Sequence, residues 1–165
     1  MKNSFKTLLL LGMVTFFAAC DTDLEIQKHP TATTYLTYDS VKAIEFGADD
    51  YGMKKYVMAF LKRGTNQSLS KDSANALQMA HLKNIDLMAE QGKLVLAGPF
   101  FGDQDLRGIY IFNVATLEEA EILTNSDPAI EAGVLHMELM EWYGSAALMG
   151  VNDVHLTLAK KSITE

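Results

Sequence analysis

The sequence predicts an α+β fold in which two helices cover one face of a four-stranded antiparallel sheet. The first observation is the order of the patterns, because residues 54–142 read as strand, helix, strand, strand, helix and strand. The second is composition: 48% of the 165 residues are hydrophobic and 21% are charged, as in globular proteins. The third is the presence of glycine or proline at several junctions between these segments.

The first 19 residues have the pattern of a secretion signal. Lys2 and Lys6 precede an apolar run at residues 8–19, which is too short to span a bilayer. The run ends in small residues before Cys20, and this ending resembles a bacterial lipobox. The resemblance implies lipidation of Cys20 and a protein anchored in the bacterial cell envelope, facing away from the cytoplasm. An ordinary secretion signal, cleaved after Ala19, is the alternative.

Residues 20–53 are interpreted as a tether that contains a short helix. The first part of this segment shows little hydrophobic periodicity, which is typical of a flexible linker. Asp39 or Ser40 is in position to cap a short helix that runs to Phe46. Gly47 is the expected stop of that helix.

The core domain is expected at residues 54–142 and begins with a strand and a helix. Residues 54–63, KKYVMAFLKR, form the first predicted strand. After a loop, Ser70 or Asp72 is in position to cap an amphipathic helix. Gly92 is the expected stop of this helix.

Two strands, a second helix and a last strand complete the domain. The strands are expected at residues 93–97, 108–114 and 134–142. Thr116 and Glu119 form a capping box for the helix between the last two. This order is the ferredoxin-like pattern, with both helices on one face of the sheet. Residues 143–165 form a C-terminal extension whose apolar spacing fits a helix or a strand, and helix-forming residues favour the helix.

Both faces of the predicted sheet are apolar. In the first strand, one face carries Tyr56, Met58 and Phe60, and the other carries Val57, Ala59 and Leu61. Two helices cannot cover both faces, and an exposed apolar sheet face usually marks an interface. We therefore expect a homodimer in which the two sheets pack face to face, as a dimeric α+β barrel.

The last predicted strand also has two distinct faces. Its apolar face carries Leu135, Met137 and Leu139, whereas His136 and Glu138 lie on the other face. If the apolar set packs on the helices, His136 and Glu138 point toward the space between two sheets. There they form a polar pocket, lie at a solvated barrel mouth, or pair with each other.

A histidine interrupts the apolar stripe of the first predicted helix. The stripe is formed by Ala74, Leu77, Leu82, Ile85, Met88 and Ala89. His81 falls near the middle of this stripe, between Met88 and Ala74. One reading is a buried histidine with a hydrogen-bond partner, and the other is a functional group in a pocket.

The chain from residue 54 to residue 142 resembles the YCII-related domain family. The matching pieces are YVMAFLKRG, AHLKNIDLMAEQGKLVLAGP with His81, DLRGIYIFNVATLEEA, DPAIEAG, and a last strand that ends in EWYGSAALM. The resemblance implies a ferredoxin-like fold that dimerises as an α+β barrel. It also implies a His–Asp pair in the candidate active site, and the matching residues here are His81 and Asp127.

Members of the wider group imply small cyclic substrates and proton-transfer chemistry, as in a dehydrochlorinase of aromatic breakdown and in muconolactone isomerases. A histidine held by a carboxylate suits general acid–base catalysis. Asp127 has a second reading, because Asp127-Pro128 is also typical of a helix cap. One carboxylate can serve both purposes, since it has two oxygens.

Three further residues are candidates for substrate binding. Arg63 and Asn66 lie where the first strand ends and are placed to bind an anionic substrate, although a solvated strand edge gives the same pattern. Phe100 lies in the loop after the second strand, which is positioned to cover a pocket.

Several function classes find no support in the sequence. The net charge is −7 without a basic cluster, which argues against a nucleic-acid partner. Cys20 is the only cysteine, and the four histidines form no HxH or HxxxH pair, so we predict no metal site. We predict no cofactor, because haem ligation by His81 has no supporting motif.

Two functional hypotheses follow. In the first, the protein is an envelope-anchored enzyme that uses His81 and Asp127 for proton transfer on a small organic substrate. In the second, it is a non-catalytic module that binds a small molecule or dimerises on its membrane tether.

Overall fold

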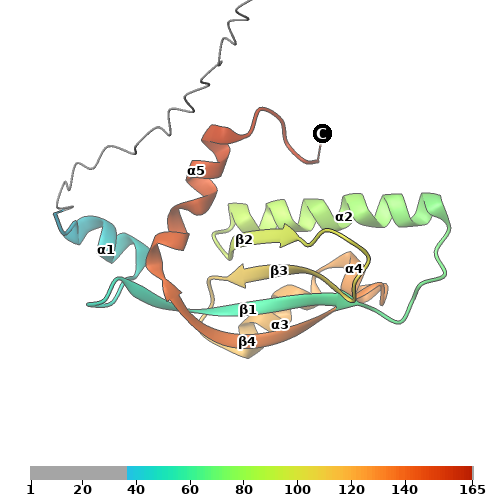
Figure 1. Cartoon of the computed structure of the whole chain (residues 1–165), viewed down its shortest axis with the longest axis horizontal. Coiled ribbons are helices and arrows are strands. Elements are labelled where there is room, and N and C mark those ends of the chain that lie inside the picture. Colours follow the sequence, from blue (N-terminus) through green and yellow to red (C-terminus); the bar gives the residue numbers. More distant parts are fainter. Residues whose placement is uncertain (1–36, 165) are drawn as a thin grey trace, which may run out of the picture. The chain divides into compact units, whose positions relative to one another are not determined.

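The computed structural model describes residues 37–164 (Figure 1). The predicted signal segment, Cys20 and the first half of the tether, up to residue 36, lie outside the described residues, so the predictions for them stay predictions. The elements are α1 (Ser40–Phe46), β1 (Met53–Arg63), α2 (Lys71–Glu90), β2 (Leu94–Pro99), β3 (Leu106–Phe112), α3 (Leu117–Asn125), α4 (Pro128–Glu131), β4 (Leu135–Ser145), the 3-10 helix η1 (Ala146–Gly150) and α5 (Val151–Leu158). Within residues 37–164, no helix combines the length and the hydrophobicity needed to cross a membrane.

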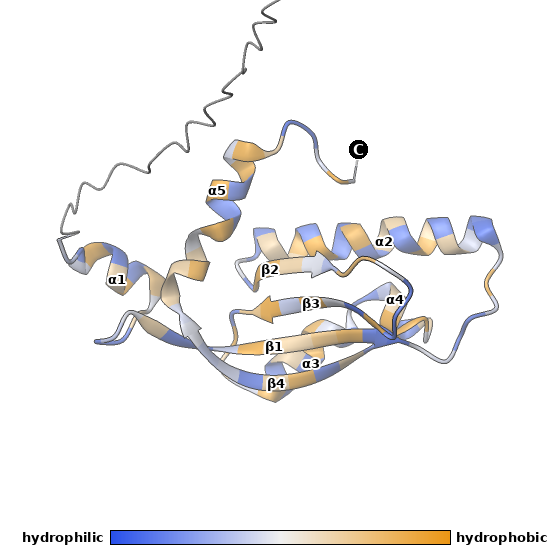
Figure 2. Ribbon diagram, in the orientation of Figure 1, coloured by the Kyte–Doolittle hydropathy of each residue, from blue (hydrophilic) through white to orange (hydrophobic). Residues whose placement is uncertain are grey.

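The four strands form one antiparallel sheet in the order β2-β3-β1-β4. Strand β1, whose central part is hydrophobic (Figure 2), lies between β3 and β4. It pairs with β4 along its whole length, from Met53 opposite Ser145 to Arg63 opposite Leu135. Helices α2 and α3 lie on one face of this sheet (Figure 1). This is the ferredoxin-like α+β arrangement, and the predicted fold class is confirmed.

The helix ends follow the predicted capping chemistry. The Ser70 side chain accepts the backbone N–H of Ser73 at the start of α2. Thr116 accepts the N–H of Glu119 at the start of α3 at 3.2 Å, while the Glu119 carboxylate accepts the N–H of Ala115 at 2.8 Å. These contacts satisfy N–H groups that have no partner inside a helix.

The main core lies between the sheet and the helices. Val57, Ala59 and Leu61 of β1 face this core, as do Tyr110 and Phe112 of β3. The apolar face of β4, formed by Leu135, Met137 and Leu139, packs against the same cluster, as its alternation predicts. The inward face of every central strand is therefore covered by helices.

The opposite face of the sheet is partly covered by the chain's own C-terminal segment, and no sequence pattern predicted this cover. Tyr56, Val95 and Ile111 are buried there, and Leu148 and Met149 of η1 pack on them. Residues after β4 fold back over one end of this face, so only the rest of it is left for the predicted second protomer.

The last strand is also longer than predicted. Its expected end was Trp142, but β4 continues to Ser145 because β1 begins at Met53 and supplies a partner that far. The Tyr56 hydroxyl donates a hydrogen bond to the Ser145 carbonyl at 3.0 Å. The chain then turns into η1 and α5, which confirms the helical reading of the C-terminal extension.

Candidate active site

His81 and Asp127 form a buried hydrogen-bonded pair. His81 Nδ1 lies 2.7 Å from Asp127 Oδ2, although 46 positions separate the two residues in the sequence. The Asp127 side chain is fully buried and His81 is 7% exposed. Helix α2 supplies the histidine, and the start of α4 supplies the carboxylate.

Asp127 divides its two oxygens between two tasks. Oδ1 accepts the backbone N–H of Ala129 at 2.9 Å and so caps α4, in which Pro128 occupies the first turn. Oδ2 is left to face His81. The cap therefore fixes the orientation of the carboxylate, and Asp127 is at once the cap of α4 and the hydrogen-bond partner of His81.

A third side chain, Tyr110 of β3, completes the cluster. Its hydroxyl oxygen lies 3.3 Å from His81 Nε2, and the two rings stack with centroids 6.3 Å apart. An ionised Asp127 is an acceptor only, so His81 Nδ1 must carry a proton. In the neutral imidazole, Nε2 then has a lone pair, which accepts a hydrogen bond from the Tyr110 hydroxyl.

His81 and Tyr110 form one wall of a cavity of about 290 Å³ between α2 and the sheet. Most of its other walls are apolar and come from Leu61, Leu82, Ile85, Ala97, Pro99, Leu135 and Ile163. His81 is thus positioned between a buried carboxylate and an apolar space of small-molecule size.

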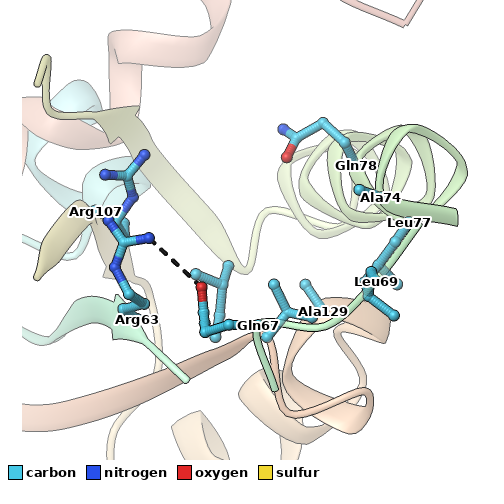
Figure 3. A pocket seen from close by; sticks show the side chains of 10 residues that line it. Arg63, Gln67, Leu69, Ala74, Leu77, Gln78, Arg107 and Ala129 are labelled. Atoms are coloured by element: carbon cyan, nitrogen blue, oxygen red, sulfur yellow. Dashed lines mark hydrogen bonds between the residues drawn. The ribbon is translucent and has the colours of Figure 1, made fainter. Parts of the chain in front are cut away.

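A second cavity, of about 240 Å³, adjoins the first. Gln78, Arg107 and Leu135 line both cavities, so the two hollows share a boundary. Figure 3 shows Arg63 and Arg107 on one side of the second cavity and the start of α2 on the other. This part of α2 stands away from the sheet, since residues 71–76 are all exposed.

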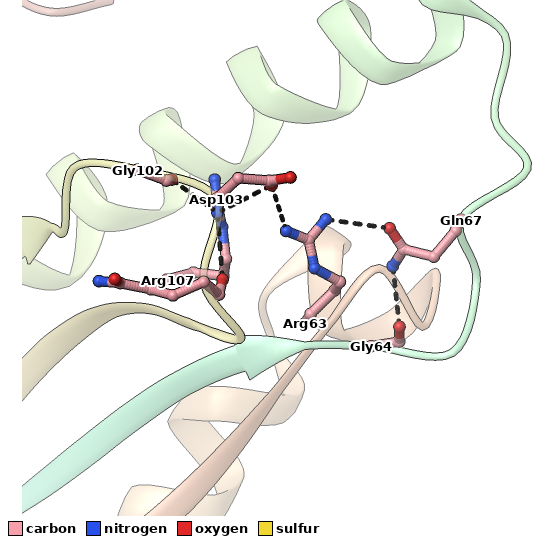
Figure 4. Close-up of polar contacts among 7 residues, drawn as sticks. Arg63, Gly64, Gln67, Gly102, Asp103 and Arg107 are labelled. Atoms are coloured by element: carbon pink, nitrogen blue, oxygen red, sulfur yellow. Dashed lines mark hydrogen bonds and ion pairs between the residues drawn. The ribbon is translucent and has the colours of Figure 1, made fainter.

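Asp103 bridges the two arginines that line the second cavity (Figure 4). Its Oδ1 lies 2.5 Å from Arg63 Nη2 and 3.7 Å from Arg107 Nη1. The hydrogen bond and charge of Arg63 lower the pKa of the Asp103 carboxyl, so this group is ionised at neutral pH. Arg107 also donates to the carbonyls of Gly102 and Gln104.

The structure brings some of the predicted site residues together and separates others. Arg63 lines the second cavity. Asn66 and Phe100 line neither of the two cavities described here. Asn66 instead ties its loop to the Ala132 and Gly133 carbonyls, at 3.0 and 2.9 Å. Substrate binding by Asn66 and Phe100 therefore gains no support from the cavities.

The polar residues of β4, His136 and Glu138, contact neighbouring residues of β1. Glu138 forms an ion pair with Lys62 at 2.6 Å, and His136 Nδ1 lies 3.2 Å from the Arg63 carbonyl. Both side chains are exposed on the face away from the helices. Within residues 37–164, no group of three or more His, Cys, Asp or Glu side chains is arranged to hold a metal ion.

Sequence reasoning missed Tyr110, Arg107, Gln78 and Ile163. In the sequence, Tyr110 is one of several apolar residues of the third strand, and its pairing opposite Ala59 in the structure places it on the helix side. Gln78 lies three positions before His81, so the helical period alone would have placed it on the same face. No local pattern points to Arg107 or Ile163, because both reach the cavities only through the tertiary fold.

Tyr110 makes the stability of the fold sensitive to alkaline pH. Burial, and then the negative charge of Asp127, raise the pKa of its hydroxyl far above the ordinary value of 10. The folded state therefore keeps a proton that the unfolded chain releases above about pH 10. The free energy of unfolding is expected to fall by about 1.4 kcal/mol per pH unit above that point.

Urea unfolding at pH 9, 10 and 11 measures this slope. The Tyr110→Phe variant should show a shallower loss of stability above pH 10 than the wild type. Parallel pH profiles for the two proteins would mean that Tyr110 ionises as readily in the folded state as in the unfolded chain.

Comparison with known proteins gives a family match and a similar solved structure. The family model of the YCII-related domain matches residues 56–143, which include His81, Tyr110 and Asp127. Among solved structures, the chain is similar to 5-chloro-2-hydroxyhydroquinone dehydrochlorinase from Burkholderia phenoliruptrix AC1100, in complex with 2,5-dihydroxybenzoquinone. That likeness has 19% identity and a TM-score of 0.41, and it covers 52% of this chain and 92% of the other. The search of curated proteins found no match.

Proposed function

The chain belongs to the YCII-related domain family. We propose that it is an enzyme that catalyses proton transfer to or from a small organic substrate. His81 is the general acid/base, and Asp127 is the residue that positions it. The observation that carries this proposal is a buried Asp–His–Tyr cluster whose His81 and Tyr110 line a mostly apolar cavity of about 290 Å³.

The geometry suits proton abstraction. Asp127 holds the Nδ1 proton, so the neutral ring offers its lone pair at Nε2. After the ring takes up a proton there, the nearby carboxylate stabilises the imidazolium. For this step, the hydrogen bond between the Tyr110 hydroxyl and Nε2 has to break so that the substrate can reach Nε2. The distance between these two atoms is 3.3 Å, which is longer than in a typical O–H hydrogen bond.

Hydrogen–deuterium exchange tests the proposal without a known product. Small carbon acids, each with a C–H next to a carbonyl group, are incubated with the protein in D₂O, and the loss of the C–H signal is followed by proton NMR. At least one compound should exchange faster with the protein than without it. His81→Gln should slow this exchange by roughly 10²–10⁴-fold.

The matched control is His155→Gln, because His155 is an exposed histidine on α5. This variant should exchange the same compound at the wild-type rate. Equal rates for wild type and His81→Gln would contradict the proposed role of His81, and so would a panel that never exchanges above background.

A second candidate function is a non-catalytic binding module. It is favoured by the hydrogen bond between the Tyr110 hydroxyl and His81 Nε2. Nε2 is the ring nitrogen that does not face Asp127, so this bond competes with a substrate for the catalytic atom. In that case, His81→Gln binds the same small molecules as the wild type, and neither protein promotes exchange.

We also propose a homodimer through the sheet face opposite α2. This proposal is supported by apolar side chains that the C-terminal segment leaves open: Phe60 and Ile109 are half-buried and Met140 is 60% exposed. Sedimentation of the chain without residues 1–36 should give a dimer at micromolar concentration, and Met140→Lys should weaken it. A stable wild-type monomer would contradict this proposal.

The envelope anchor is a proposal as well, and it rests on the signal-like residues 1–19 and on Cys20. Several acyl chains on one cysteine would hold the protein stably on a membrane. In cells that express the full chain, labelled palmitate should be incorporated by the wild type and not by Cys20→Ser. Equal labelling of both would contradict lipidation at Cys20.

A further inference from the structure

The second cavity has a distinct electrostatic character. Among residues 37–164, Arg63 and Arg107 are the only charged residues that line it, and no acidic side chain of this range lines either cavity. The two arginine side chains are 36% and 35% exposed, so most of each lies against the protein. A cavity with two partly buried guanidinium groups and no acidic wall is suited to an anion.

Both arginines currently share one carboxylate, and that carboxylate comes from outside the cavity wall. The Asp103 side chain is 92% exposed, on the loop between β2 and β3. Ion pairs with so exposed a partner are screened by water and contribute little to stability. Asp103 is therefore a partner that a better-placed anion can replace.

The Arg107 guanidinium has N–H donors that are available to bind such a ligand. Among residues 37–164, all hydrogen bonds recorded from its guanidinium start at Nη1 and go to the Gly102 and Gln104 carbonyls. These bonds hold the group in place and leave Nη2 and Nε unused. A planar guanidinium with two adjacent free donors matches the two oxygens of a carboxylate.

We infer that Arg63 and Arg107 form a binding site for the carboxylate of a small organic acid, and that Asp103 occupies this site in the absence of the ligand. Arg107 also lines the cavity of His81, so the apolar body of a ligand held at the arginines would extend toward His81. The direction of the ligand toward His81 rests on the proposed function, whereas the carboxylate site does not.

Binding of benzoate, with benzamide as its neutral analogue, tests the inference by calorimetry. Asp103→Asn removes the competing charge and should bind benzoate about fivefold tighter than the wild type. Asp105→Asn is the matched control, because it removes the same charge from an exposed residue of the same loop. Its affinity for benzoate should stay within about twofold of the wild type.

Arg107→Gln should weaken benzoate binding at least about tenfold and leave benzamide binding unchanged. The inference is overturned if Asp103→Asn and Asp105→Asn bind benzoate equally, if Arg107→Gln weakens both probes alike, or if Asp103→Asn shows no saturable binding. Failure of the proposed function gives a different result: benzoate then binds as expected, but His81→Gln has no effect on exchange.

Discussion

Replacing Gly64 by alanine is expected to lower the free energy of unfolding by more than about 3 kcal/mol. Gly64 follows β1, where the chain passes very close to the start of β4. A Cβ atom at this position would lie 2.1 Å from the Gly133 carbonyl oxygen and 2.7 Å from the carbonyl carbon of Val134. All of these atoms belong to the backbone, so no side-chain rotation can relieve the overlap.

The same contact holds the site together. The N–H of Gly64 donates to the Val134 carbonyl at 2.7 Å, and the N–H of Asn66 donates to the Gly133 carbonyl at 2.9 Å. These bonds join the loop before α2 to the segment that follows Asp127 and α4. A loss of this size is a large part of the stability of an ordinary domain, so Gly64→Ala should be partly unfolded at 37 °C.

Urea unfolding followed by circular dichroism measures the effect. The matched control is Gly98→Ala in β2, where an added Cβ meets no atom within 4 Å. This control should change the free energy of unfolding by less than about 0.5 kcal/mol. If the two variants were equally stable, the close approach of Gly64 to Gly133 would be wrong.

Asp127→Ala is the second change with a large expected effect, a loss of about 3 kcal/mol in the free energy of unfolding. It removes the acceptor of the Ala129 N–H and the partner of His81 Nδ1, and both of these groups are buried. A buried donor without an acceptor costs about 1–3 kcal/mol. The two losses together account for the size of the effect.

Thr116→Ala is a control for the capping contribution alone. Thr116 caps α3 as Asp127 caps α4, but within the described part of the chain its side chain bonds only the N–H of Glu119. We expect a loss of about 1 kcal/mol for Thr116→Ala in the same urea experiment. An equal loss for both variants would mean that the bond between Asp127 and His81 adds nothing to stability.

Most of the fold could be predicted from the sequence because its signals are local. Caps at Ser70 and Thr116 mark the starts of the two main helices. The alternation in β1 and β4 assigns each face of the sheet correctly. The cover of the outer face by η1 could not be predicted, since the apolar spacing of this segment does not tell on which side of the sheet Leu148 and Met149 lie after β4.

The candidate site divides in the same way. His81 could be found because it interrupts an apolar stripe, and Asp127 through a family resemblance and a cap motif. The distance between the two could not be found, because it depends on how α4 docks on α2. Arg107 could not be found from the sequence because a single arginine in a strand forms no repeating pattern. It comes close to Arg63 only in the folded chain, where both arginines contact Asp103.

The tautomer of His81 tests the central claim, that Asp127 positions this ring for proton transfer. It can be read from ¹⁵N NMR of the imidazole at pH 9, in the wild type and in Asp127→Asn. We expect the proton on Nδ1 in the wild type, because the nearby carboxylate can only accept. In Asp127→Asn, the amide keeps its oxygen for the Ala129 N–H and turns its NH₂ toward His81, so the proton should move to Nε2. A wild-type ring protonated at Nε2, or the same tautomer in both proteins, would contradict the account.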